Sequence, residues 1–302
     1  MYIVNHRTLF FWITGVILAA ALGAIVFFGL PLGIDFTGGS LLEATYTTSE
    51  PSLDVLKKSV TDRVALGEIS LRQSGETGVT LRTRTLTPAE HEAVLSALTL
   101  GGTAEFTEDK FTSVGPALGT ELGKKAIWAI LAVVLAIVLY IAWAFRKVPP
   151  PVPGWTYGLT VVAMLAIDII VPTGFFAALC HFTGAQVDSL FVVALLALLG
   201  YCVNDVIVIF DRVREHLAKN EKTGLKESFE TTIGKSIDET MTRSINTGLT
   251  VALALLALVF FGAPVTVNFA LVMLVGVVAG TFSSICRSAP LLIPLAHRFA
   301  KK

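Results

Sequence analysis

Charge is scarce in this chain. Only 15% of its 302 residues are charged and 54% are hydrophobic, and the mean hydropathy of +0.73 lies outside the range of soluble domains. Basic and acidic residues number 23 each, so the net charge of zero gives no reason to expect a nucleic-acid partner. The composition predicts a membrane protein.

Signals for bound groups are also few. The three cysteines, Cys180, Cys202 and Cys286, lie in apolar runs, which predicts buried structural thiols and no disulfide framework. The five histidines show no metal-ligand spacing, and no phosphate-binding loop of the Gly-x-x-x-x-Gly-Lys-Ser/Thr kind is present. We therefore expect no metal, no ATP hydrolysis and no cofactor.

Long apolar runs are what the sequence does contain. Six of them are long enough to cross a bilayer: 10–30, 126–145, 155–180, 189–210, 240–261 and 265–288. Arg7 precedes the first run and no small-residue cleavage site follows it, which favours a retained span over a cleaved signal.

Basic residues predict how these spans are oriented. The loops at 181–188 and 262–264 contain no lysine or arginine, whereas the N-terminus, the loops at 146–154 and 211–239 and the tail at 289–302 are basic. By the positive-inside rule both termini are cytoplasmic and the segment 31–125 lies outside. This predicts four parts: 1–30 with the first span, the outside domain 31–125, spans two to six at 126–288, and the tail 289–302.

The outside segment predicts a small α+β domain of ferredoxin-like type. Thr87 and Glu90 form a capping box with Pro88 at the first helical position, a strong helix-start signal. Alternating and helical patterns give the order β-α-β-β-α-β. The expected elements are a strand at 42–46, a helix from Pro51, strands near 69–71 and 79–81 joined by a turn at 74–78, a helix from Pro88, and a strand at 104–114.

Two cytoplasmic segments have patterns of their own. Val148–Pro153 is too rich in proline to be helical and predicts a stiff connection between spans two and three. The segment 225–237 has an apolar helical face, and two interpretations remain open: a helix lying on the membrane surface, or a solvated loop helix.

The most informative polar residue is Asp205, about six residues inside the cytoplasmic end of span four. Inserting a carboxylate within a membrane span costs about 2.5–3.5 kcal/mol of free energy on insertion scales, so such a residue usually has a function. Arg243 lies at similar depth on span five and continues as one polar stripe through Asn246, Thr247 and Thr250. Such a stripe should face protein or water, and the two open interpretations are a proton-responsive pair or a static ion pair.

Two further features lie inside the spans. Asp168 is near the middle of span three, four residues before the helix-disrupting Pro172, and is either a second relay carboxylate or a structural, protonated aspartate. Gly276 and Gly280 on span six have Gly-x-x-x-Gly spacing, which favours close helix packing.

Several motifs together resemble those of the SecF family. Its members are subunits of the bacterial SecD–SecF protein-export complex and belong to the resistance–nodulation–division (RND) superfamily. The match spans nearly the whole chain in order. The motifs are GIDFTGG at 33–39, SVGP at 113–116, GYCVND at 200–205, FDRVRE at 210–215, TRSINT at 242–247 and GTFSS at 280–284. The motif residues singled out are Asp35, Phe36, Gly38, Gly39, Gly200, Asp211, Arg212, Gly276 and Gly280.

The resemblance implies a function. It implies a multi-pass protein of the bacterial inner membrane that acts with SecD beside the SecYEG channel and uses the proton motive force to assist late steps of translocation of unfolded polypeptides. It implies that Asp205 is the proton-responsive acid and Arg243 its partner, with Asp168 matching an acid common in span three. Cys202 stands where serine is usual and Val206 where serine or threonine is usual, so a proton path here would use water or Asn204, with Asn246 on the facing stripe.

Two other classes of function compete with this reading. A stand-alone RND-like exporter of a lipid or small molecule would need either a second six-span half with its own relay acids or close homodimerisation, together with a substrate-sized cleft in the outside domain. An intramembrane aspartyl protease would use Asp168 and Asp205, but such enzymes carry Gly-x-Gly-Asp at one acid, and Asp205 follows Val203 and Asn204 instead. We expect a transport subunit and not an enzyme.

Overall fold

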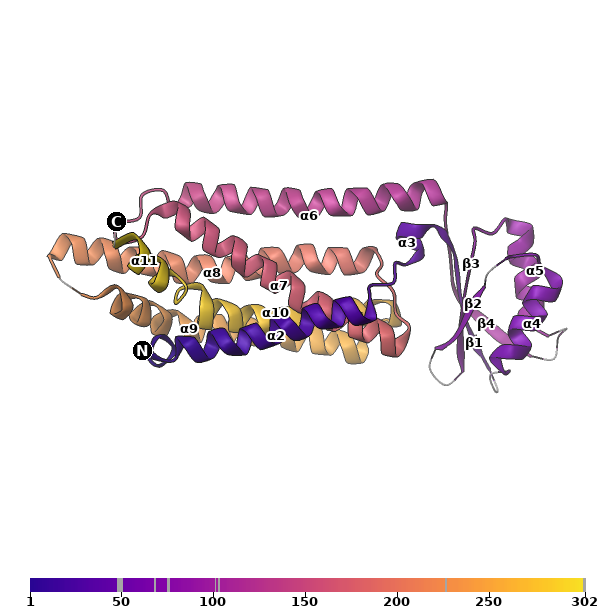
Figure 1. Ribbon diagram of the computed structural model, residues 1–302. Helices are drawn as coiled ribbons and strands as arrows, with labels where there is room; N and C mark the ends of the chain where they lie inside the picture. The colour runs from indigo at the N-terminus through magenta and orange to yellow at the C-terminus, as the bar shows by residue number, and fades with distance from the viewer. Residues whose placement is uncertain are drawn as a thin grey trace. The chain divides into compact units, whose positions relative to one another are not determined.

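The computed structural model describes residues 1–47, 51–67, 69–74, 77–100, 102, 104–225 and 227–300 (Figure 1). Part of the turn expected at 74–78, and the basic residues Lys226, Lys301 and Lys302, lie outside these residues. The chain divides into a helical unit, formed by Met1–Leu30, Trp128–Ala185 and the chain from Leu190 on, and an α+β unit formed by Pro31–Ile127 and Gln186–Ser189.

The α+β unit contains one antiparallel four-stranded sheet in the order β2-β3-β1-β4. Its strands are β1 (Gly39–Tyr46), β2 (Ser70–Ser74), β3 (Gly78–Thr83) and β4 (Phe106–Val114), and its helices are the short α3 (Ile34–Thr37), α4 (Leu53–Arg63) and α5 (Pro88–Leu98). Both longer helices cover the same face of the sheet in Figure 1. The β-α-β-β-α-β order confirms the ferredoxin-like prediction.

Local sequence explains why these elements form. Leu42, Ala44 and Tyr46 alternate along β1 and are at most 2% exposed, so one face of the strand lies on the core. Thr87 and Glu90 form the predicted capping box, with reciprocal bonds between each side chain and the other's backbone N–H, and Pro88 begins α5.

The helical unit contains the six predicted membrane-spanning helices. They are α2 (Arg7–Phe28), α6 (Pro116–Ala144), α7 (Gly154–Thr183), α8 (Ser189–Thr223), α9 (Phe229–Phe261) and α10 (Pro264–Ser283). The short α1 (Tyr2–Asn5) precedes them, and after α10 the chain continues through a π-helical turn, η1 (Ser284–Ser288), into α11 (Leu292–Ala300). All three cysteines are buried and free, as predicted.

The segment 225–237 differs from both interpretations offered for it. From Phe229 it is the first part of α9, which runs without a break into the membrane-spanning part. Ile233 and Ile237 are at most 1% exposed, in the same core cluster as Val213 and Leu217 of α8. Ile233 and Ile237 therefore lie in a core shared with the extended end of α8 and with the N-terminal α1, and neither a membrane surface nor solvent is needed to explain them.

Candidate functional site

Asp205 lies at a junction of three elements in the helical unit. Its side chain is on α8 and the residue is 8% exposed. The hydroxyl of Ser244 on α9 donates to Oδ1 at 2.5 Å, and the hydroxyl of Ser284 in η1 donates to Oδ2. Both carboxyl oxygens therefore have a hydroxyl donor, which is what a polar group buried in a membrane-spanning bundle requires.

Small residues bring the elements around Asp205 together. A side chain added at Gly276 would clash with Leu198, and one added at Gly280 with the sulfur of Cys202, so these glycines let α10 approach α8. On α9, a Cβ added at Gly248 would lie 2.6 Å from Oγ1 of Thr281. This close packing places Ser244 and Ser284 on opposite sides of the same carboxyl.

The polar stripe on α9 points away from this junction. Arg243, Asn246, Thr247 and Thr250 are all exposed, and so is Asn204 on α8. Among the described residues no ion pair joins Arg243 to Asp205; Ser244, the next residue along, makes the contact instead. The functional pairing of Arg243 with Asp205 stays a prediction, and the stripe is left uncovered by this chain.

Asp168 has a partner that the sequence analysis missed. It is buried on α7, and its Oδ1 lies 3.8 Å from Nη2 of Arg287 in η1, with side chains 3% and 5% exposed. Ser283 and Cys202 also face its carboxyl. Asp168 and Asp205 are therefore both contacted by residues of the π turn.

A simple signal could have identified Arg287. It is the only charged residue between Arg243 and Arg298, and it lies at the end of the predicted sixth span. An arginine in that position is a functional candidate by default. The sequence does not indicate which residue pairs with Arg287, because Asp168 is 119 positions away (287 minus 168).

The motif at 33–39 shapes the start of the α+β unit. Asp35 accepts hydrogen bonds from the backbone N–H and hydroxyl of Ser189, at 2.8 and 2.5 Å. Gly38 and Gly39 have φ of +75° and +127°, and an added Cβ would lie 2.6 Å from Cα of Pro116 and 2.7 Å from the carbonyl oxygen of Thr83, respectively. Only glycine fits such a backbone without strain.

Three of the four remaining motif residues make contacts in the structure. Phe36 packs beside Gly119 and Gly123. Asp211 pairs with Arg214, and Arg212 pairs with Glu215 and Glu239, whereas a Cβ at Gly200 would meet nothing within 4 Å. The Arg212–Glu239 pair ties the extended end of α8 to the start of α9.

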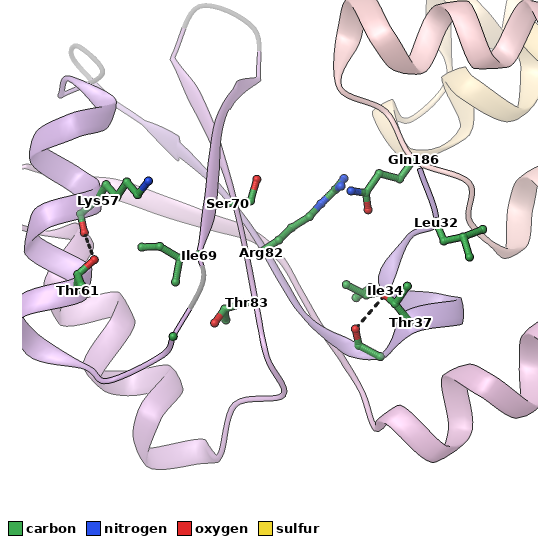
Figure 2. Close-up of a pocket in the computed structure, with 12 residues that line it drawn as sticks. Leu32, Ile34, Thr37, Lys57, Thr61, Ile69, Ser70, Arg82, Thr83 and Gln186 are labelled. Atoms are coloured by element: carbon green, nitrogen blue, oxygen red, sulfur yellow. Dashed lines mark hydrogen bonds between the residues drawn. The ribbon is translucent and has the colours of Figure 1, made fainter. Parts of the chain in front are cut away.

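The α+β unit has an open pocket of about 610 Å³, shown in Figure 2. Lys57 of α4 and Arg82 of β3 supply its cationic side chains, Ile69 contributes an apolar wall, and Arg82 points toward Gln186 in Figure 2. Its lining residues all belong to the α+β unit, and of the predicted site residues only Gly38 is among them.

The chain has six helices long and apolar enough to span a membrane, with an α+β domain between the first two, and its sequence matches a class of protein-export membrane proteins with two family models. Residues 95–298 match the family model "Protein export membrane protein SecD/SecF, C-terminal", and residues 23–50 match the SecD/SecF GG motif. The chain is 36% identical to the SecF protein translocase subunit of Thermobaculum terrenum and 34% identical to that of Anaerolinea thermophila, covering 96% of this chain and 92% of the relative in each case. The chain belongs to the SecF family and is a multi-pass bacterial membrane protein.

A solved structure supports the same fold. The crystal structure of SecDF, a translocon-associated membrane protein from Thermus thermophilus, matches with a TM-score of 0.82 at 27% identity. The match covers 99% of this chain but 39% of that one, so this chain spans about two fifths of the solved SecDF chain.

Proposed function

We propose that this chain is the subunit that, together with SecD, uses the proton motive force to assist late steps of polypeptide translocation through the SecYEG channel. Membership of a family of protein translocase subunits supports a transport role rather than catalysis. The coupling ion is the proton, and no other cofactor is proposed.

The uncovered polar stripe on α9 is the observation that carries this proposal. Arg243 and Asn246 lie on the exposed face of a helix long and apolar enough to span a membrane. Lipid cannot solvate a guanidinium and an amide, so that face requires protein or a water-filled path between proteins. The solved SecDF chain contains sequence well beyond the part that this chain matches. A SecD chain is the partner that would cover the stripe.

The orientation follows from the basic loops. With both termini cytoplasmic, the α+β unit lies in the periplasm. A cysteine introduced at Thr87 should react with a membrane-impermeant thiol reagent in intact cells, whereas one at Lys222 should react only after lysis. If only the Lys222→Cys variant reacted in intact cells, the proposed orientation would be wrong and the α+β unit would lie in the cytoplasm.

Protonation of Asp205 can change how the helices around it pack. As a carboxylate it accepts from Ser244 on one oxygen and from Ser284 on the other. Protonation turns one of these oxygens into a donor, so the serine facing it must turn its own hydroxyl away. Ser284 has another acceptor in reach, the carbonyl oxygen of Thr281 at 2.9 Å. The serine oxygen then accepts from the carboxyl, so the proton reverses one hydrogen bond between α8 and its neighbours and replaces a charge-assisted bond with a weaker neutral one. A bundle with two packings responds by shifting between them.

An export assay with controlled proton motive force tests this role. Asp205→Asn keeps the shape of the side chain but cannot change charge, and should abolish the stimulation of export while insertion and SecD binding remain. Glu221→Gln, an exposed acid on the same helix, is the matched control and should export normally. Wild-type export per assembled complex in Asp205→Asn would remove Asp205 from the mechanism.

A further inference from the structure

The π turn η1 contacts both buried acids of the bundle. Its five residues are all buried, and it joins α10 to α11. Ser284 at its start donates to Asp205 of α8, and Arg287 near its end pairs with Asp168 of α7. The hydroxyl of Ser288 donates to the backbone carbonyl of Ser284, which closes the turn on itself.

The wider turn explains how two residues three positions apart reach different helices. In an α-helix, residues at i and i+3 lie on the same face. A π turn has i→i+5 hydrogen bonds and accommodates more residues per turn, so the directions of Ser284 and Arg287 diverge. Such turns inside helices occur frequently at functional sites.

Arg287 cannot lie there without its partner. Among the described residues, the Asp168–Arg287 pair is the ion pair in which both side chains are at most 5% exposed; in every other pair the less exposed side chain is at least 17% exposed. Removing one member of a buried pair leaves an uncompensated charge, which is strongly unfavourable. The position of the π turn is therefore tied to Asp168.

We propose that Arg287 is a positioning residue for Asp205. Its pair with Asp168 fixes the π turn, and the turn in turn holds the hydroxyl of Ser284 at the carboxyl of Asp205. The two acids are coupled through the backbone of η1, although among the described residues no side-chain contact joins Arg287 to Asp205 directly. The importance of this coupling for export rests on the proposed proton role of Asp205, but its existence does not.

Infrared spectroscopy of the purified full-length chain can test this coupling. The carboxyl bands that disappear in Asp205→Asn define the signal of Asp205, and their frequency reports the hydrogen bonds which that side chain accepts. Ser284→Ala should shift these bands because one donor is lost. Arg287→Met should shift them in the same direction by most of that amount, and Arg287→Lys should restore most of the wild-type frequency.

Controls separate positioning from loss of fold. Asp168→Asn/Arg287→Met removes both charges, so it leaves no unpaired charge and should insert even if Arg287→Met alone does not; it should show the same shift. Lys222→Met, at the exposed end of α8, should leave the bands unchanged.

Two results would overturn the coupling. One is a wild-type Asp205 band in the double variant while Ser284→Ala shifts it. The other is an unshifted band in Ser284→Ala itself. Normal export in a variant whose band has shifted would instead contradict the proposed function, so the two failures are distinguishable.

Discussion

The two units of this chain distribute polar groups in opposite ways. In the α+β unit the core is apolar, with Leu56, Val60 and Val94 fully buried, and charges such as Arg84 and Glu90 pair at the surface. In the helical unit the outside is apolar, with Trp128 71% and Phe261 90% exposed, while carboxylates, serines and an arginine lie inside.

The difference follows from the solvent that each unit meets. Water solvates surface charge and drives apolar side chains inward, whereas lipid accepts apolar side chains and excludes polar ones. A charged residue in the α+β unit therefore needs no special explanation. A charged residue buried in the helical unit does. Among the residues whose burial is described there, Asp168, Asp205 and Arg287 are the charged ones that are buried, and each contacts or belongs to the same π turn.

The largest expected effect is in the buried pair. Asp168→Ala leaves Arg287 without a counter-charge and should lower the free energy of unfolding by about 3–5 kcal/mol. Detergent-induced unfolding of the purified chain measures this. The double variant Asp168→Ala/Arg287→Met should recover much of the loss, because no unpaired charge remains. A single-variant loss below about 1 kcal/mol would mean that the pair is effectively solvated.

The apolar core of the α+β unit should be nearly as sensitive. Leu56→Ala removes a fully buried side chain and should destabilise that unit by about 2–5 kcal/mol. Val55→Ala, its neighbour on the same helix, is the control, since Val55 is 50% exposed. Hydrogen exchange of peptides from 39–114 in the full chain compares the two. Equal effects would contradict the assigned core.

The glycines of the motif at 33–39 test where backbone strain lies. Gly39→Val places a branched side chain at φ +127° against the carbonyl of Thr83, at a cost of about 1–3 kcal/mol. Gly15→Val on α2, where an added Cβ meets nothing within 4 Å, should insert normally. The readout is the yield of folded chain after membrane extraction. Equal yields for both variants would mean that Gly39 has no structural role.

Much of the fold could be predicted because it is encoded locally. The alternation along β1, the capping box at Thr87 and the six apolar runs each need only a few neighbouring residues to be recognised. The one clear error, at 225–237, arose because an apolar helical face has the same appearance whether membrane or another helix covers it. What covers it, the end of α8 together with α1, depends on tertiary structure.

The candidate site was harder because its contacts join distant residues. Asp205 and Asp168 are conspicuous as acids in apolar runs, but serines are common in spans, and nothing local distinguishes Ser244 or Ser284 from the others. The pairing of Arg243 with Asp205 rests on their similar depth, on the polar stripe and on the family resemblance, and it stays a prediction. Depth does not determine which face of a helix a residue occupies, and the structure places Ser244 on the inner face and Arg243 on the outer one.

The smallest expected effect concerns a surface pair, where the contrast with the bundle is sharpest. Hydrogen bonds lower the pKa of Glu90 to about 2; the bond from Arg84 has the largest effect, and those from Thr87 add to it. Because the folded pKa lies below the usual value of about 4.3, the stability from this carboxylate is complete above that value and is lost as the pH falls toward about 2. Solvent screens so exposed a pair, so the loss should be slight.

Hydrogen exchange at the start of α5 should be faster in Glu90→Gln than in the wild type at neutral pH, and this difference should shrink between about pH 5 and pH 2. Glu92→Gln, an exposed acid on the same helix, is the control. A difference that persists at the acidic end would show that the glutamate acts through the shape of its capping contact and not through its charge.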